Sequence, residues 1–328
     1  MSKNPGDADG LCIASLEETS SSKRRRALVI VNPYATMVSD RLRTLALRAL
    51  QTRYDIEAVQ TRARGHATEI ASQAANDGYS VVIAFGGDGT VNEVANGLAG
   101  SPTPLSCLPG GSANVYCKLL GIPGEIVAAT EHLLALADCW APRQVDLGSV
   151  DGRYFTFCAG IGMDARVVGD VDARPQLKSR FGASFFLAST IWTFGRHYLI
   201  GAPRMTVSVE GRNVEGVTTI VQNAEHYTFF NDRPIDMAAG GGLNSGTLAS
   251  VVLRRASLIG APSLLARAVA RSLTVSGHHQ VATFTPTSSL AVHSSDARAL
   301  PLQLDGDYIG DVTEATFTIE PGALTVVA

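Results

Sequence analysis

Four short segments rich in glycine and polar side chains each follow an apolar run in the first half of the chain. They are 32–35 (NPYA), 61–66 (TRARGH), 86–90 (GGDGT) and 109–114 (PGGSAN). Because the carboxyl ends of parallel strands meet at one edge of a sheet, we expect the four segments to lie together. Glycine lets the backbone approach a ligand closely, and free amides at a helix start attract negative charge. The segments therefore predict a site for a polyphosphate.

Asp88 stands among the glycines of the third segment, and the hydroxyls of Thr90 and Ser112 are predicted at the same edge. A carboxylate beside phosphate is repelled unless a cation or a substrate proton lies between them, so Asp88 predicts Mg²⁺ binding or general-base chemistry. The structural alternative is a cap for the helix that begins near Thr90. The lysine of a P-loop and the glycine loop of protein kinases are absent. Four such segments at one edge favour a functional site.

The region from Ala27 to Leu147 alternates short apolar runs with amphipathic segments, as in a parallel sheet covered by helices. Strands are predicted at 27–31, 56–60, 81–85, 105–108 and 143–147, and helices at 40–51, 67–76, 90–98, 113–120 and 125–137. The alternation predicts a doubly wound, Rossmann-like α/β domain over 27–148.

Beyond Gly148 the sequence changes to β-branched runs separated by turn residues, such as Asp151-Gly152 and 210–213 (EGRN). This pattern predicts a mainly antiparallel β domain over 149–313, interrupted by one helix at 263–273. The last strand-like run lies within 314–328, and the pattern leaves open whether it returns to the first domain. The segment 160–165 (GIGMDA) lacks the βαβ context of a dinucleotide fingerprint, so we interpret it as a tight turn after a strand.

Length and composition limit the function classes. A chain of 328 residues favours two domains, and 45% hydrophobic with 17% charged residues is typical of a globular protein. The net charge of -3 gives no reason to expect a nucleic-acid partner. Five widely spaced cysteines without a CxxC pair indicate a reduced, cytoplasmic compartment. The longest apolar stretch, 181–194, is shorter than the ~20 residues that span a bilayer.

Basic residues provide the signal for a membrane surface. Residues 1–26 are predicted to be a flexible tail that ends in the run 23–26 (KRRR). With Lys178 and Arg180, this run would support peripheral contact with anionic lipid, at about 1 kcal/mol for each residue. Ordinary solvated charge is the alternative. Residues 181–194 would line an acyl-chain pocket or form part of the core.

Taken in order, the motifs resemble those of the diacylglycerol kinase catalytic-domain superfamily, which includes bacterial lipid kinases and sphingosine and ceramide kinases. The resemblance extends from Ala27 to the carboxyl end. The matching segments are 32–33 (NP), Thr61 with Gly65, 86–94 (GGDGTVNEV), 109–114 (PGGSAN), 145–148 (VDLG), 159–165 (AGIGMDA) and 304–307 (LDGD). Their order and spacing make chance similarity improbable.

The resemblance implies an ATP- and Mg²⁺-dependent lipid kinase, with a nucleotide-binding α/β domain above a β-sandwich domain that binds the lipid. It implies that the proton acceptor is one of Asp305, Asp307 and Asp88, in that order, and that Asp88 and Asp146 serve the metal. The residues implied to bind ATP are Asn32, Thr61, Gly86, Gly87, Asp88, Gly89, Thr90, Asn92, Gly111, Ser112 and Asn114. Outside the resemblance, Asp305-Gly306 is equally a hairpin turn.

Three departures from the family pattern affect these expectations. Val115 stands where many bacterial members have an aspartate, Asp307 replaces the usual glutamate, and 242–247 contains no carboxylate for a second Mg²⁺. Diacylglycerol is the favoured substrate. A sphingosine- or ceramide-type kinase, an NAD-kinase-like enzyme and a non-catalytic lipid-binding protein are the alternatives. The oligomeric state is left open, with a homodimer among the options.

Overall fold

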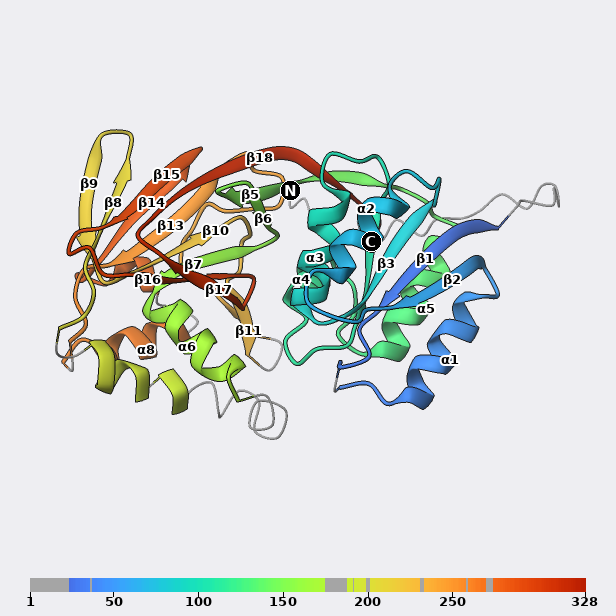
Figure 1. Ribbon diagram of the computed structural model, residues 1–328, viewed down its shortest axis with the longest axis horizontal. Helices are drawn as coiled ribbons and strands as arrows, with labels where there is room; N and C mark the ends of the chain where they lie inside the picture. Colours follow the sequence, from blue (N-terminus) through green and yellow to red (C-terminus); the bar gives the residue numbers. More distant parts are fainter. Residues whose placement is uncertain are drawn as a thin grey trace, which may run out of the picture.

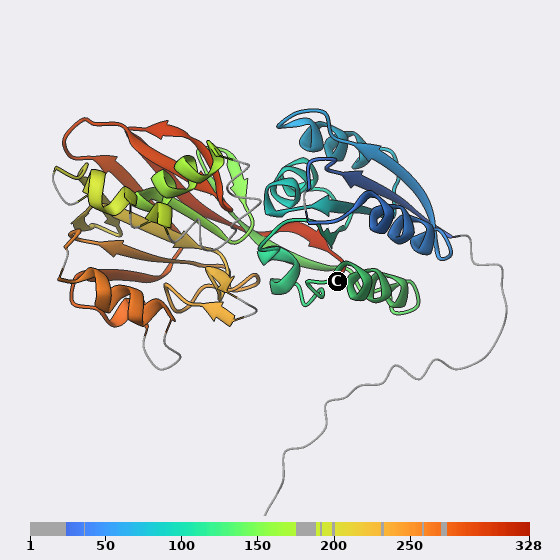
Figure 2. The same cartoon turned by 90° about the horizontal axis from the view of Figure 1, so that it is seen from below.

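The computed structural model describes residues 24–35, 37–174, 188–190, 192–198, 201–230, 233–257, 259–269 and 274–328. Two halves lie side by side in both views, and a pair of strands runs between them (Figure 1 and Figure 2). The first half is α/β, and the second is mainly antiparallel β.

The first half is built on four parallel strands in the order β2-β1-β3-β4. They are β1 (Arg25–Val31), β2 (Tyr54–Gln60), β3 (Val81–Gly86) and β4 (Leu105–Pro109). Val31 at the end of β1 pairs with Gln60 and with Phe85, and Gly86 pairs with Pro109. The four strands therefore end at the same edge of the sheet.

Helices connect these strands: α1 (Asp40–Leu50), α2 (His66–Ala74), α3 (Asp88–Leu98), α4 (Val115–Leu119) and α5 (Ile126–Leu136). The helix α1 packs against α5, and α2 packs against α3. The chain moves from β1 outward to β2 and then back to β3, so α1 and α2 cover opposite faces of the sheet. This arrangement confirms the predicted doubly wound fold.

The second half contains a six-stranded antiparallel sheet in the order β14-β13-β10-β7-β16-β17. The elements of this half are β5 (Arg143–Val150), β6 (Arg153–Phe155), β7 (Cys158–Gly162), α6 (Met163–Asp172), η1 (Phe194–Tyr198), β8 (Met205–Val209), β9 (Arg212–Gly216), β10 (Thr218–Gln222), β11 (Thr228–Phe230), β12 (Arg233–Ile235), β13 (Leu248–Leu253), α8 (Ala261–Val269), η2 (Val275–Gly277), β14 (Val281–Thr287), β15 (Ser289–Ser294), β16 (Leu300–Leu304), β17 (Asp307–Val312) and β18 (Glu314–Val326). The sheet shares one buried core with β8, β15 and β18, where Phe155 and Phe317 meet edge to face. The two layers form the predicted sandwich.

The strand β18 joins the two halves. Val326 near its end pairs in parallel with Leu105 of β4, while earlier residues pair with β5 and β15. Figure 1 shows β18 and β5 crossing together from one half to the other. One sheet therefore runs through both halves. The domain bounds of 27–148 and 149–313 stay a prediction, since the shared sheet gives no clear boundary between the halves.

Two-residue turns close three of the hairpins. Both central residues have positive φ at Asp151-Gly152 (48° and 84°), Glu210-Gly211 (49° and 80°) and Asp305-Gly306 (49° and 82°). Positive φ at both positions matches the right-handed twist of a hairpin and suits Asp-Gly in particular. The turns expected from these dipeptides are confirmed.

The segment 160–165 differs from its interpretation as a tight turn. The strand β7 ends at Gly162, and the helix α6 begins at the next residue. Gly162 has φ of 94°, and a Cβ there would lie 2.4 Å from the carbonyl oxygen of Val217. A glycine is therefore needed at this junction, and the sequence signal marked a strand-to-helix connection.

The described part of the basic run, Arg24–Arg26, is not a loose tail, and Arg25 and Arg26 already belong to β1. Arg24, Arg25 and Arg26 donate to the carbonyl oxygens of residues 51, 137 and 77, near the ends of α1, α5 and α2. Arg25 also stacks on Trp140, and Arg26 on Tyr79. Cations are favoured at helix carboxyl ends, so the fold of the first half uses these charges.

Other membrane-related expectations fall on residues that the structure does not describe. Residues 1–23, Lys178, Arg180 and most of 181–194 are among them. Within the described ranges, no helix is both long and apolar enough to cross a bilayer.

Candidate active site

The four glycine-rich and polar segments meet at the carboxyl edge of the parallel sheet. Asn32 Nδ2 donates to Thr90 Oγ1 at 3.1 Å, which joins the first segment to the third. The Gly110 amide donates to the Gly86 carbonyl at 2.9 Å, which joins the fourth segment to the third. Thr61 N donates to Val31 O beside them. The convergence expected from strand order is therefore present.

The contact between the third and fourth segments requires glycine at Gly111 and leaves little room for a side chain at Gly87. A Cβ on Gly111 would lie 2.7 Å from Gly87 Cα, closer than side-chain carbons approach one another. Any larger residue at Gly111 would separate the third and fourth segments. The contact between the two loops is therefore sufficient to explain these glycines, whether or not a ligand also approaches them.

Asn114 shapes the fourth segment internally. Its Oδ1 accepts from the Gly111 amide at 2.9 Å, its Nδ2 donates to the Gly111 carbonyl at 2.7 Å, and its φ is 49°. Both ends of the side chain are used within the loop. Ser112, at the exposed tip of the same loop, is placed to meet a ligand.

Asp88 is the first residue of α3, and its carboxylate faces the start of α4. Its Oδ1 accepts from the Tyr116 amide at 3.0 Å, and the amide of the buried Val115 lies close as well. Burial, with smaller contributions from the charges of Asp305 and Asp307, raises the pKa of Asp88 to about 6 against the opposing effect of the Tyr116 and Val115 amides. The carboxylate is therefore in a position where a nearby cation would be strongly favoured.

Asp305 lies in the interior, only 3% exposed, with donors around both carboxylate oxygens. Oδ2 accepts from Asn92 Nδ2 at 2.7 Å and from the amide and hydroxyl of Thr156 at 2.6 and 2.8 Å. Oδ1 accepts from the amides of Phe157 and Cys158, both at 3.0 Å. Asp305 thus connects α3 of the first half to the β6–β7 connection of the second.

Asp307, two residues later, lies on the other side of the turn. A Cβ on Gly89 would be 2.3 Å from Asp307 Oδ2, so this carboxylate lies directly against the first turn of α3. Its side chain is 32% exposed, and Arg64 Nη2 lies 3.7 Å away. Arg64 also donates to the Tyr308 carbonyl at 3.2 Å. An acid of the second half therefore faces the glycine segments of the first.

Gln303 holds this turn in position through hydrogen bonds. Its Oε1 accepts from the Gly306 amide at 2.8 Å, while its Nε2 donates to Asp164 Oδ2 at 2.8 Å. Asp164 also accepts from the hydroxyl of Tyr227, and burial raises the pKa of its carboxyl. Gln303 is 1% exposed, so the contacts are shielded from water.

Asp146, an expected metal residue, has a different environment. Its Oδ2 accepts from the Gly246 amide at 2.7 Å, and its Oδ1 accepts from the Gly322 amide at 2.9 Å. These contacts tie β5 to the loop before β13 and to the irregular part of β18. No cluster of three metal-ligating His, Cys, Asp or Glu side chains occurs within the described part of the chain.

Three residues at the site were not identified from the sequence. Glu93 accepts from the amides of Gly65 and Ala67 and so caps α2, while Arg64 and Gln303 contact the Asp305–Asp307 turn. Glu93 and Arg64 lie within or beside motifs already recognised. No local signal identifies Gln303, because only one of its partners, Gly306, is near in the chain, whereas Asp164 is 139 residues away.

Comparison with known proteins agrees with this arrangement. The family "Diacylglycerol kinase catalytic domain" matches residues 26–150. A diacylglycerol kinase of Bacillus subtilis is 28% identical over 299 residues, which cover 87% of this chain and 91% of that protein. A diacylglycerol kinase of Staphylococcus aureus is 32% identical over 163 residues, covering 48% and 50%.

Solved structures show the same fold. A crystal structure of a diacylglycerol kinase from Bacillus anthracis superposes with a TM-score of 0.68 at 20% identity, covering 93% of this chain and 97% of that one. The family match lies over the glycine segments and the parallel sheet, and the fold match extends over both halves. Residues 26–150 thus match the diacylglycerol kinase catalytic domain, and the chain is similar to a diacylglycerol kinase over most of its length, which identifies it as a kinase.

Proposed function

We propose that the protein transfers the γ-phosphate of ATP to the hydroxyl of a membrane lipid, converting diacylglycerol to phosphatidic acid. The catalytic-domain match and the names of the relatives in Bacillus subtilis and Staphylococcus aureus support this substrate. The observation that carries the proposal is the position of Asp307, an acid from the second half that lies against the first turn of α3.

The triphosphate would lie along the carboxyl edge of the parallel sheet. The third and fourth segments present backbone amides and the exposed Ser112 there, next to Asn32 and Thr90. Anions bind well at such helix starts because the amides have no partner within the helix. Thr61 and the short second segment border the same edge. Asn92 and Asn114 support this edge from within, since their amide groups bond to Asp305 and Gly111.

Asp307 is our choice for the proton acceptor, ahead of Asp305. The lipid hydroxyl oxygen attacks the γ-phosphorus, the bond from that phosphorus to the bridging oxygen breaks, and ADP leaves. The hydroxyl proton passes to the Asp307 carboxylate. Phosphoryl transfer depends mainly on position and charge neutralisation, and a single acceptor carboxylate suffices for the proton. Asp305 already accepts five hydrogen bonds and would hold the turn in place.

The residues fit one Mg²⁺ at Asp88 and none at Asp146. Mg²⁺ is commonly held by one or two carboxylates together with substrate phosphates and water. Burial raises the pKa of Asp88, and a cation beside this carboxylate would relieve the unfavourable charge, which supports the Mg²⁺ position. Bound Mg²⁺ would neutralise charge on the phosphates. Both oxygens of Asp146 accept backbone amides, so its role would be to fix the crossing strands.

A radiolabel transfer assay with a substrate panel tests the function. ATP labelled at the γ-phosphate is offered with vesicles of diacylglycerol, sphingosine or ceramide, and separately with NAD. We expect label in the lipid product of diacylglycerol. Label in the NAD product alone would identify a soluble-metabolite kinase, and lipid binding without any transfer would identify a non-catalytic relative.

The enzyme would reach its substrate from the cytoplasm by peripheral contact with the membrane. Sedimentation of the full chain with vesicles, with and without anionic lipid, tests this contact. Failure to sediment with either would contradict it. A homodimer is tested by light scattering of the same sample.

A further inference from the structure

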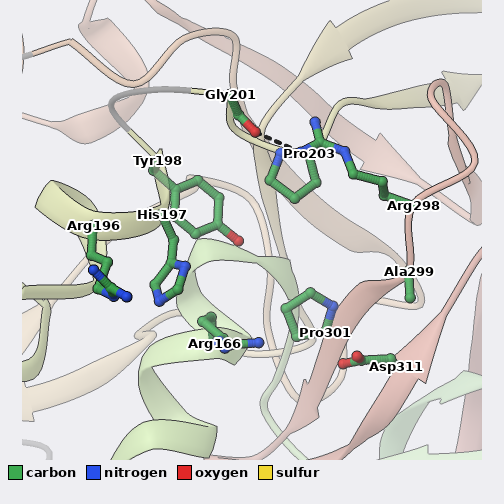
Figure 3. Close-up of a pocket in the computed structure, with 10 residues that line it drawn as sticks. All are labelled: Arg166, Arg196, His197, Tyr198, Gly201, Pro203, Arg298, Ala299, Pro301 and Asp311. Carbon is green, nitrogen blue, oxygen red and sulfur yellow. Dashed lines mark hydrogen bonds between the residues drawn. The ribbon is translucent and has the colours of Figure 1, made fainter.

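A second concave site lies in the β half, at the opposite end of β17 from Asp307. The cavity has a volume of about 230 Å³ and is formed by α6, η1, the loop before β8, the loop before β16, and β17. Figure 3 shows the side chains around it. They are Arg166, Arg196, His197, Tyr198, Gly201, Pro203, Arg298, Ala299, Pro301 and Asp311.

Arg298 forms one wall of the cavity and is held firmly. Its Nη1 and Nη2 donate to the carbonyls of Gly201 and Ala202 at 2.6 and 2.7 Å. Its Nε and Nη2 also bond to Asp296 Oδ2 at 2.9 and 2.6 Å. These contacts join the loop before β8 to the loop before β16. Arg298 therefore shapes the site, and Asp296 already balances its charge.

Arg166, Arg196 and His197 remain to meet a ligand. Arg166 comes from α6, and its Nε lies 3.8 Å from Asp170 Oδ1, its one carboxylate neighbour within ion-pair distance among the described residues. Within the described residues, Arg196 has no carboxylate within ion-pair distance. Figure 3 shows the His197 ring between Arg196 and Arg166, with the end of Arg166 turned toward Pro301 and Asp311. Two cations and an imidazole from α6 and η1 thus line the same cavity.

The sequence around η1 has an excess of basic over acidic residues. No aspartate or glutamate occurs between residues 173 and 209, whereas Arg174, Lys178, Arg180, Arg196 and Arg204 all do. On the opposite rim, Asp311 accepts from the hydroxyl of Tyr308 at 2.7 Å and is the one acid among the described lining residues. The cavity therefore favours a compact anion on its α6–η1 side.

We propose that this cavity binds a phosphate monoester through Arg166, Arg196 and His197, at a site separate from the catalytic edge. Guanidinium groups match phosphate oxygens in geometry and give the stronger, charge-assisted hydrogen bonds. A phosphate group and its ester oxygen fit within the volume of about 230 Å³. The ligand is either the monoester headgroup of a lipid or free inorganic phosphate.

Binding of the full-length protein, measured without ATP, tests this proposal independently of the kinase reaction. Two arms are run: vesicles of neutral lipid with phosphatidic acid, and titration with inorganic phosphate by calorimetry. Vesicles with phosphatidylglycerol at equal surface charge control for general attraction. Binding in the vesicle arm alone identifies a lipid headgroup, and binding in the phosphate arm shows that the free ion suffices.

Matched variants identify the cavity as the site. Arg196→Ala and Arg166→Ala should each weaken phosphate-monoester binding by roughly tenfold, the effect of losing one partly exposed charge-assisted hydrogen bond. Asp311→Asn should strengthen it, because a like charge is removed. Arg204→Ala removes the same charge from an exposed position outside the cavity and should change it little.

Thermal unfolding of each variant shows whether it remains folded. Equal losses for Arg196→Ala and Arg204→Ala would show general surface attraction and overturn the proposal. So would unchanged binding in both Arg196→Ala and Arg166→Ala, or no monoester binding by the wild type in either arm.

Discussion

The turn between β16 and β17 has an interior side and a side that faces the glycine segments, and one carboxylate lies on each. Asp305 faces inward, is 3% exposed and accepts hydrogen bonds from one side chain of α3 and from the β6–β7 connection. Asp307 faces the glycine segments and is 32% exposed. Two acids of the same type, two residues apart, are thus suited to different tasks. Burial with full hydrogen bonding holds a structure, while partial exposure leaves an oxygen accessible to a substrate.

The largest expected effect is at Asp307, on the side of the turn that faces the glycine segments. Asp307→Asn should lower turnover by ~10²- to 10⁴-fold, the range for loss of a general base, with little change in thermal unfolding. Turnover is measured with the substrate identified in the label-transfer assay. Asp151→Asn supplies a control, since Asp151 lies in an exposed hairpin turn away from the site. Turnover close to that of the wild type in Asp307→Asn would remove it as the acceptor.

Substitution of Asp305, on the interior side, should show the opposite pattern, because it should mainly lower the free energy of unfolding. Asp305→Asn replaces one acceptor oxygen by an NH₂ group that faces backbone or side-chain donors. Breaking such a buried charged network costs about 2–4 kcal/mol in the free energy of unfolding. Asparagine tolerates the positive φ of this turn, so the turn itself is preserved. Denaturant unfolding measures the loss.

Asp151→Asn is a close control here as well, because it makes the same substitution in the same kind of Asp-Gly turn. We expect its free energy of unfolding to stay within about 0.5 kcal/mol of the wild type. A stable but inactive Asp305→Asn would restore the ranking drawn from the sequence, in which Asp305 is the proton acceptor.

Local pattern was sufficient for the fold. The alternation of apolar and amphipathic segments indicated the strands and helices of the first half to within a few residues, and Asp-Gly dipeptides marked two of the hairpins. Strand order then brought the glycine segments together. The start of α6 at Met163 was not found, because Gly162 was interpreted as a turn residue. The basic run at Arg24–Arg26 was assigned to a tail because its aromatic and carbonyl partners are remote in the sequence.

The roles of the acids depended on contacts that no local pattern reveals. Asp305 is paired with Asn92, and Asp146 with Gly246 and Gly322, at separations of at least 100 residues. A motif can show that an acid belongs to the site. It does not show whether donors of the folded chain already surround its oxygens, and this decides between a base, a metal ligand and a structural acceptor.

Gln303 tests whether the position of the turn controls catalysis. Gln303→Leu keeps the volume but removes the bond to the Gly306 amide, so Asp307 would be held less firmly. We expect turnover to fall by roughly tenfold, as a barrier change of about 1.4 kcal/mol, with KM for ATP nearly unchanged. Gln303→Asn should recover part of the loss. A higher KM for ATP with unchanged turnover would show that Gln303 does not position Asp307.

The smallest effect concerns Asp88, where stability should increase on mutation. Burial raises the pKa of Asp88 to about 6 from the model-peptide value of 3.8, so the folded state holds the proton more tightly than the unfolded state. The wild type therefore loses stability as pH rises from about 4 to 6, and Asp88→Asn does not. At pH 7 the variant should be more stable by roughly 1 kcal/mol, after allowance for solvent screening, and near pH 3.5 the two should be equal. Denaturant unfolding at the two pH values measures the difference. A variant less stable at pH 7 would show that the carboxylate's bond to the Tyr116 amide outweighs the cost of its burial.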